Sequence, residues 1–134
     1  MYLVNNAFVI SLNLKMSELG FKELKVWRKA VHFADMCIEL CDGLETDRKH
    51  FRLIEQLESA STSVSLNIAE GKGRQHKKEF IQYLYIARGS AYETLTLLNI
   101  FYKRNWIAAE TLREMESHGE EVIKMLKGLI NSIR

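Results

Sequence analysis

The sequence predicts an all-α fold, namely an antiparallel four-helix bundle with up-down-up-down topology. Apolar residues recur at three- and four-residue steps over four long segments, which is the period of an amphipathic helix. The 134 residues include no proline, the residue that interrupts helix interiors. The connections between the segments are short, so successive helices are expected to be antiparallel neighbours within one domain.

The first two predicted helices are separated by glycine and polar residues. The first spans about residues 24–41 and ends at Gly43, which is available as a left-handed cap. Its apolar stripe consists of Trp27, Val31, Ala34, Ile38 and Cys41. The second helix spans about residues 48–70, and Gly71 and Gly73 end it. Its stripe consists of Phe51, Ile54, Leu57, Ala60 or Ser61, Val64 and Ile68.

The last two predicted helices span about residues 77–104 and 108–133. The stripe of the third consists of Phe80, Leu84, Ala87, Ala91, Leu95, Leu98 and Phe101. The stripe of the fourth consists of Leu112, Met115, Gly119, Val122, Leu126, Leu129 and Ile133. Residues 80–87 are apolar nearly all round the helix, with Gln82 as the only polar side chain. A bundle helix needs only one apolar stripe, so the second face predicts a further subunit and hence a homo-oligomer.

Small residues in the second and third helices predict a close crossing between them. Residues 59–65 are rich in small hydroxyl residues, and Gly89-Ser90-Ala91 would allow the same approach from the third helix. Gly89 is therefore expected to lie in the contact, where Gly89→Leu would disrupt packing. The alternative, a serine nucleophile, needs a nearby base and an orienting group, and no histidine lies in this stretch.

Cysteine and histidine usage indicates neither a disulfide nor a metal site. Cys37 and Cys41 lie four residues apart in one predicted helix, where a disulfide is geometrically awkward. We interpret them as small core residues of a reduced, cytoplasmic protein. No metal-ligand spacing joins them to the histidines, which are His32, His50, His76 and His118. The sequence thus predicts no catalytic residue, no cofactor and no metal.

Residues 1–20 are predicted to form an N-terminal extension outside the bundle domain, which takes in residues 21–134. The segment from Met1 to Leu14 carries no charge, and its apolar stretch is too short and broken to span a bilayer. It also lacks the basic start of a secretory signal. One hypothesis is that residues 1–15 lie upstream of a natural start at Met16. The other is a native arm that packs on the bundle or on a neighbour.

The end of the second helix carries polar residues of structural rather than catalytic type. Asn67 lies near the apolar stripe, so its amide is expected to bond to backbone or to a facing side chain. Glu70 could pair with Arg74 or with a basic residue on another helix, and one carboxylate without a partnered acid or base is not an active site. The segment from Gly71 to Arg74 superficially suggests a phosphate loop, but it lacks the strand–loop–helix order and the Gly-Lys-Ser/Thr ending of a P-loop.

Several short sequence blocks follow one another in a fixed order along the chain, and they include Trp27, Asn67, Ile68, Ala69, Glu70, Gly71, Gly89, Ser90 and Glu93. Together these blocks resemble the bacterial family of 23S rRNA intervening-sequence proteins. The resemblance covers roughly residues 21–130, and residues 1–20 fall outside it. The resemblance implies an up-down-up-down bundle, a homo-oligomer in the form of a pentameric ring, and no catalytic activity. A related branch, the accessory proteins of diversity-generating retroelements, is strongly basic and binds nucleic acid, whereas this chain has a net charge of only +2.

A local basic cluster is the strongest indication of nucleic-acid binding, because the net charge is too small to argue it globally. The residues form two groups, one around the connection between the second and third helices and one at the start of the first helix. We call them together the basic rim: Lys72, Arg74, Lys77, Lys78, Lys25, Arg28 and Lys29. In an antiparallel bundle both groups should lie at one end and could contact phosphates. The alternative is a solvated loop and helix face.

The fourth helix argues against nucleic-acid binding, because the first half of this helix is acidic and should repel a polyanion. The residues are Glu110, Glu114, Glu116, Glu120 and Glu121. Two classes of function therefore remain. The first is a protein associated with ribosomal RNA or another nucleic acid. The second is an assembly module whose oligomer presents a surface to a protein partner. Neither class involves a membrane or a small-molecule substrate.

Overall fold

A computed structural model describes residues 18–46 and 50–134, and the described residues form one short 3-10 turn and four α-helices, with no strand among them. The elements are η1 (Gly20–Glu23), α2 (Lys25–Asp42), α3 (Phe51–Lys72), α4 (Lys77–Lys103) and α5 (Ala109–Ile133). The predicted all-α class is therefore confirmed. The hypotheses about residues 1–15 and Met16, and the predicted start of the second helix at residue 48, lie outside the described residues.

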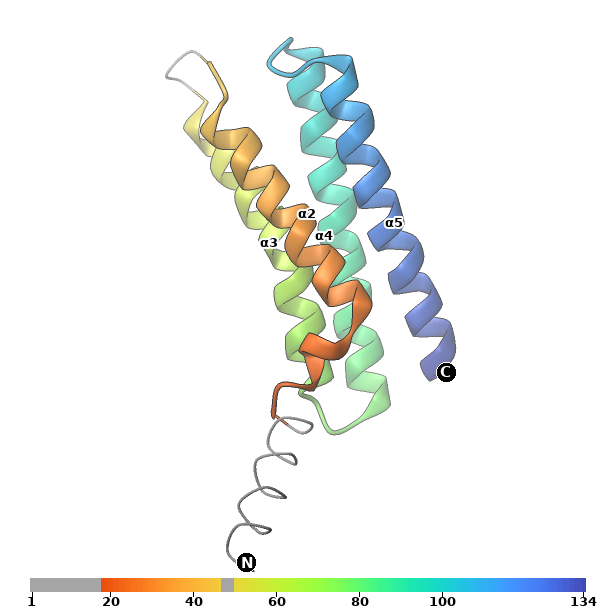
Figure 1. Cartoon of the computed structure of the whole chain (residues 1–134). Coiled ribbons are helices and arrows are strands. Elements are labelled where there is room, and N and C mark those ends of the chain that lie inside the picture. Colours follow the sequence, from red (N-terminus) through yellow and green to blue (C-terminus); the bar gives the residue numbers. More distant parts are fainter. Residues whose placement is uncertain (1–17, 47–49) are drawn as a thin grey trace, which may run out of the picture.

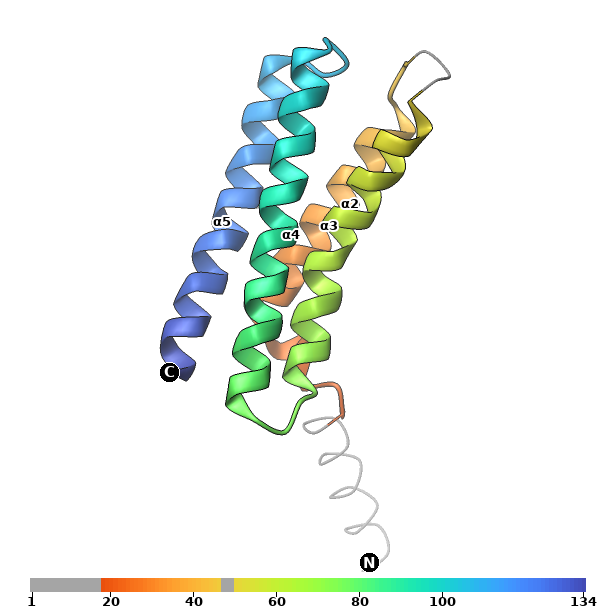
Figure 2. The ribbon, with the colours of Figure 1, turned by 180° about the vertical axis from the view of Figure 1, so that it is seen from behind.

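The helices lie side by side in the order α2, α3, α4, α5. Figure 1 shows α2 rising from the lower end, α3 descending, α4 rising and α5 descending. The pair α3 and α4 has the most extensive contact, and Figure 2 shows these two helices joined by a short turn at the lower end. Among the neighbouring helices, α2 and α5 have the least contact. The two halves of the bundle therefore meet mainly through α3 and α4.

The core is built from one face of each helix, and most predicted stripes on α3, α4 and α5 supply it. The fully buried large side chains include Phe33, Leu57, Ile68, Leu84, Leu98, Phe101 and Leu126. Phe51 is an exception, because it is the first residue of α3 and is 63% exposed. The stripe predicted for the first helix is right at Ala34 and Cys41 and wrong at Val31 and Ile38, which are exposed. The buried residues of α2 are Val26, Ala30, Phe33, Ala34, Cys37 and Cys41.

The error on α2 has a physical cause. Val31 and Ile38 are exposed, whereas Trp27 is partly buried and packs edge-on against Phe21 with ring centroids 5.2 Å apart. Because apolar residues flank the true stripe on both sides, their spacing fits two neighbouring faces of the helix equally well. Phe33 decides the orientation, since its ring is fully buried in the shared core.

Both cysteines are buried and free, as predicted for core residues. Burial raises the pKa of the Cys37 thiol to about 12, against a smaller lowering by a hydrogen bond with Ser61. Burial raises the pKa of the Cys41 thiol to about 11, and the nearby carboxylates of Glu58 and Asp42 add to the shift. Both thiols are therefore protonated at neutral pH and are poor nucleophiles, because the thiolate is the reactive form.

The close crossing of α3 and α4 is present, but Gly89 is not part of it. The Ser90 hydroxyl donates to Ser63 Oγ across the two helices at 3.0 Å. Gly89 is exposed, and a Cβ placed on it would meet nothing within 4 Å. The expectation that Gly89→Leu disrupts packing within the subunit is therefore wrong. Adjacent helical residues point about 100° apart, so turning Ser90 toward α3 turns Gly89 outward.

Two other glycines make the close contacts. A Cβ on Gly71 would lie 2.6 Å from Tyr83 Cβ of α4. A Cβ on Gly119 would lie 2.7 Å from Leu95 Cδ2 and 3.1 Å from Phe33 Cζ. Gly71 thus allows α3 to meet α4 at the turn, and Gly119 allows α5 to approach α4 and α2.

The helix ends also differ from one expectation. Gly43 caps α2 with a φ of −91°, so it does not adopt the predicted left-handed conformation. The left-handed residue in the described part of the chain is Asn105, with a φ of 62°, in the turn between α4 and α5. Asparagine tolerates this conformation better than most residues. The turn closes with the Trp106 amide donating to the Phe101 carbonyl at 2.9 Å.

Candidate nucleic-acid interface

The two groups of the basic rim lie at the same end of the bundle, the lower end in Figure 1. The turn from α3 to α4 carries one group and the first turn of α2 carries the other. The short element η1 packs on both α2 and α3. A Cβ on Gly20 would lie 3.8 Å from Lys72 Cε, so η1 passes directly beside this lysine. The structure therefore brings together two basic groups that are far apart in the sequence.

The turn between α3 and α4 is fixed by backbone contacts at both ends. The Arg74 amide donates to the Gly71 carbonyl at 3.1 Å, and the Phe80 amide donates to the His76 carbonyl at 3.1 Å. Gly71 is buried against Tyr83 and Phe80, which holds the end of α3 close to the start of α4. Lys72 and Lys77 thus flank a tight turn, and their charges project from it.

Arg74 and Lys29 are the members of the rim that bind carboxylates. Arg74 Nη2 donates to Glu70 Oε1 at 3.3 Å and to the Tyr83 hydroxyl at 2.6 Å. This confirms the predicted pairing of Glu70 with Arg74. Lys29 Nζ lies 3.4 Å from Glu121 Oε1 of α5. Both charges are therefore partly balanced within the subunit, and Lys29 is directed toward α5.

The remaining cations of the rim have no such partner among residues 18–46 and 50–134. No carboxylate oxygen in these ranges lies within 4.0 Å of the charged nitrogens of Lys25, Arg28, Lys72, Lys77 or Lys78. All of these side chains are exposed. Lys72 Nζ lies 5.7 Å from the centroid of the Phe80 ring, a cation–π contact that leaves its charge uncompensated. This end of the bundle can therefore offer several cations to an anionic ligand.

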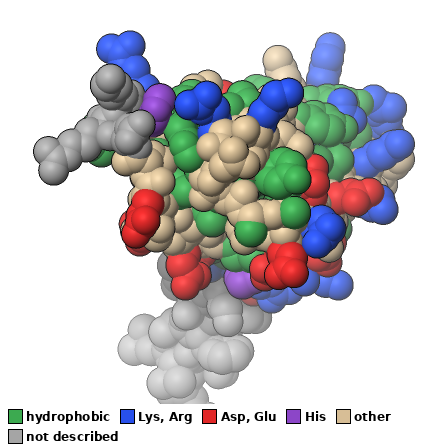
Figure 3. All heavy atoms as spheres, turned by 90° about the horizontal axis from the view of Figure 1, so that it is seen from above, with side chains coloured by type: hydrophobic (Ala, Val, Ile, Leu, Met, Phe, Trp, Pro, Cys, Tyr) green, Lys and Arg blue, Asp and Glu red, His purple; other side chains and the backbone are tan. Residues whose placement is uncertain are grey.

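The opposite end of the bundle has a mixed charge. Figure 3 views that end and shows acidic and basic side chains interspersed with hydrophobic ones. The acidic first half of α5 begins there, because α5 descends from the turn after Asn105. The glutamates of α5, which would repel a polyanion, thus begin at the end of the bundle opposite the rim.

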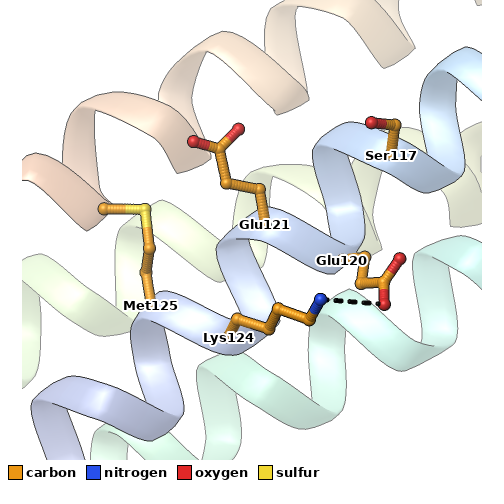
Figure 4. A pocket seen from close by; sticks show the side chains of 5 residues that line it. All are labelled: Ser117, Glu120, Glu121, Lys124 and Met125. Atoms are coloured by element: carbon orange, nitrogen blue, oxygen red, sulfur yellow. Dashed lines mark ion pairs between the residues drawn. The ribbon is translucent and has the colours of Figure 1, made fainter.

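A shallow depression on α5 does not have the features of a catalytic site. Ser117, Glu120, Glu121, Lys124 and Met125 line it. Figure 4 shows the Lys124 ammonium directed at Glu120, and the two groups lie 3.3 Å apart. Glu121 binds Lys29 of α2 instead. The charged groups that line this depression are thus held in ion pairs, Lys124 with Glu120 and Glu121 with Lys29.

Several of the residues that carry the family resemblance lie at the contact between α3 and α4. Asn67 Nδ2 donates to the Ser63 carbonyl at 2.8 Å and to Ser63 Oγ at 2.9 Å, as expected for a partly buried amide. The Ser63 hydroxyl in turn accepts from Ser90. Higher up the same pair of helices, Gln56 Nε2 donates to Glu93 Oε1 at 3.4 Å. Ile68 is fully buried, and Ala69 is half-buried. The motif is therefore chiefly a packing motif.

One group of tyrosine and arginine side chains at the surface was not identified from the sequence. Tyr85, Arg88 and Tyr92 lie on α4 at steps of three and four residues, and Arg134 approaches Tyr85 from the end of α5. The spacing on α4 was a sufficient signal, because residues so spaced share a helix face. The contact of Arg134 with Tyr85 could not be predicted from the sequence, because it depends on how α5 packs against α4.

No group of three or more histidine, cysteine, aspartate or glutamate side chains in the described part of the chain is arranged to hold a metal ion. None of the helices in the described ranges is long and apolar enough to cross a membrane.

Comparisons with known proteins agree with the resemblance seen in the motif. Among solved structures, the chain is similar to a protein of unknown function from the S23 ribosomal protein family of Bacteroides thetaiotaomicron, with a TM-score of 0.73 and 28% identity. The match covers 78% of this chain and 97% of that one. No curated protein matches the chain. Residues 22–128 match the profile of the 23S rRNA-intervening sequence protein family, so the chain belongs to this family.

Proposed function

We propose that this protein is a non-enzymatic, RNA-associated homo-oligomer that contacts RNA phosphates through the basic rim. The observation that carries the proposal is the gathering of Lys25, Arg28, Lys72, Lys77 and Lys78 at one end, without carboxylate partners in the described residues. The family description names 23S rRNA, which makes RNA the polyanion to test first. Such a role belongs in the cytoplasm, and two free buried cysteines agree with that compartment.

Lysine–phosphate contacts would position the RNA without reading its sequence, because phosphates carry no sequence information. Each subunit of a homo-oligomer, including the pentamer that the family resemblance implies, would present one rim. Modest contacts on several rims would add through multivalency when one RNA reaches more than one of them. The proposed ligand is therefore an extended or structured RNA rather than a short specific site.

A triple substitution of Lys72, Lys77 and Lys78 by alanine should weaken RNA binding by about tenfold or more at low salt, because phosphate contacts dominate affinity. The measurement is a filter-binding titration with structured RNA. A matched control removes the same charge from the opposite end, through alanine at Arg52, Lys103 and Arg104, all of which are exposed. Helicity and oligomer mass must be unchanged in both variants. Equal loss of affinity in the two variants, or no loss in either, would contradict the proposal.

A second candidate, a protein–protein assembly module, is favoured by the outer face of α4. We call the assembly face the set Ile86, Gly89 and Ile100. All three are exposed. Glycine inside a helix costs about 1 kcal/mol relative to alanine. Gly89 makes no contact within the subunit that would require it, so close approach of a second copy is the simplest reason for it.

Gly89→Leu should therefore reduce the oligomer mass at micromolar concentration while it leaves the helicity of the subunit intact. Light scattering measures the mass, and circular dichroism measures the helicity. The matched control is Gly128→Leu on α5, since Gly128 is also exposed with open space at its Cβ position. A monomer mass for the wild-type protein in light scattering would contradict the assembly proposal. If the oligomer forms but no RNA binds at low salt, the assembly module replaces the RNA-associated function.

A further inference from the structure

The exposed group on α4 and α5 alternates aromatic rings with guanidinium groups. Arg88 Cζ lies 4.9 Å from the Tyr85 ring centroid and 6.0 Å from that of Tyr92. Arg134 Cζ lies 5.9 Å from the Tyr85 ring, and its Nη2 donates a hydrogen bond to the Tyr85 hydroxyl. Tyr92 is 51% exposed. We call these residues the tyrosine–arginine stripe. Its rings are held in place by neighbouring cations and still present surface to solvent.

The stripe continues from the basic rim. Lys78 lies seven residues before Tyr85, two helical turns away on the same face of α4. From Lys78 to Tyr92 the helix rises by about 21 Å at 1.5 Å per residue. Beyond Arg88, Tyr92 lines a groove between α4 and α5 together with Leu95, Glu116, Glu120, Ile123, Lys124 and Lys127. A strand held at the rim would thus meet the tyrosines next.

The stripe borders the assembly face at Gly89, which lies four residues after Tyr85 and three before Tyr92. Ile86 and Ile100 lie further round the helix, on the side of Glu93, which accepts a hydrogen bond from Gln56 of α3. Tyr92 shares its groove with residues of α5. The oligomer mass of any tyrosine variant therefore has to be measured together with its RNA affinity.

We infer that the tyrosine–arginine stripe stacks the bases of a single-stranded nucleic acid whose phosphates are held by the rim, an inference that rests on the proposed function. Aromatic side chains beside a basic surface are the means by which proteins bind single strands, because every unpaired base offers a π-face. A duplex hides these faces in its own stack. The stripe therefore favours single strands or unpaired loops over a duplex of equal charge.

The test is a fluorescence-anisotropy titration of a short single-stranded RNA with a variant that carries both Tyr85→Leu and Tyr92→Leu. Leucine keeps bulk and helix propensity but removes the ring. Affinity should fall by about tenfold for each stacked base that is lost. Tyr102→Leu is the matched control, since Tyr102 is exposed near the far end of α4 and should leave affinity unchanged.

Inorganic polyphosphate, which has charge but no bases, separates the inference from the proposed function. The double tyrosine variant should bind polyphosphate like the wild type, whereas the triple lysine variant should bind both ligands weakly. A DNA strand of the same sequence should lose affinity as the RNA does, because the stacked surfaces are bases. If the double tyrosine variant loses affinity for only one of the two strands, RNA or DNA, base stacking is overturned.

The remaining outcomes also decide between the two ideas. If the double tyrosine variant binds single-stranded RNA like the wild type while the triple lysine variant does not, the stripe has no role and the rim stands. If the wild type binds neither RNA nor polyphosphate, both ideas fail. If the double variant loses oligomer mass, the tyrosines belong to a subunit contact and the inference is overturned.

Discussion

Replacement of Gly71 by alanine is expected to lower the free energy of unfolding by about 1–3 kcal/mol, the usual cost of overpacking. The added Cβ would lie 2.6 Å from Tyr83 Cβ and 3.3 Å from the Phe80 carbonyl oxygen. Neither atom is the free end of a side chain, so the clash can be relieved only by moving the backbone of α4. The α3–α4 contact, the most extensive in the bundle, would open at the turn.

The measurement for Gly71→Ala is urea unfolding followed by circular dichroism at one fixed protein concentration, because oligomerisation makes apparent stability concentration-dependent. Gly128→Ala is the control. It introduces the same methyl group in open space on α5 and should raise stability by up to about 1 kcal/mol through helix propensity. A stabilised Gly71→Ala protein would show that α3 and α4 are further apart at this turn than described.

RNA affinity should fall by about two orders of magnitude between 50 and 200 mM salt if the five unpaired cations of the rim each contact a phosphate. For single strands the slope of log affinity against log salt is about −0.7 per phosphate, which gives about −3.5 per subunit contacted. The effect arises because each contact releases a condensed counterion. Lys25, Arg28, Lys72, Lys77 and Lys78 are the residues counted.

Single substitutions test whether the pairing of cations within the subunit matters. Lys77→Met should reduce the magnitude of the salt slope by about 0.7, the contribution of one phosphate. Lys29→Met should change it less, since Lys29 Nζ lies 3.4 Å from Glu121 and is directed toward α5. The slopes come from titrations at several salt concentrations. An equal change for both lysines would mean that the ion pair with Glu121 does not persist when RNA binds.

The fold could be predicted from the sequence because helix period and connection length are local properties. The stripe of α5 identified its buried face, since this helix has one dominant apolar arc. On α4, which is apolar nearly all round over residues 80–87, the predicted stripe still included the buried residues Leu84, Ala87, Ala91, Leu98 and Phe101. The face of α2 could not be fixed in the same way. Val31 and Ile38 extend its apolar arc to one side, and the full burial of Phe33, which lies next to Gly119 of α5, shows which side is buried.

The candidate site was predictable where it depended on neighbours in the chain. Lys72, Lys77 and Lys78 surround a single turn, and the pairing of Arg74 with Glu70 is an i, i+4 contact. The pairing of Lys29 with Glu121 joins the first and last helices, and no local pattern encodes it. Gly89 shows the same limit, because a small residue gives no sign of which way it faces. The hydrogen bond between Ser90 and Ser63 fixes the rotation of α4, and this rotation turns Gly89 outward.

Because successive helices alternate in direction, η1 and Arg134 both lie at the same end of the bundle as the rim (Figure 1). A fluorescent dye or affinity tag attached beyond Arg134 would therefore sit beside the stripe, where Arg134 bonds to Tyr85, and could compete with a ligand. The same proximity makes a photo-crosslinker at this terminus a useful reporter of contact. A tag intended to be silent belongs instead in the turn at residues 104–108, which lies at the opposite pole of the bundle.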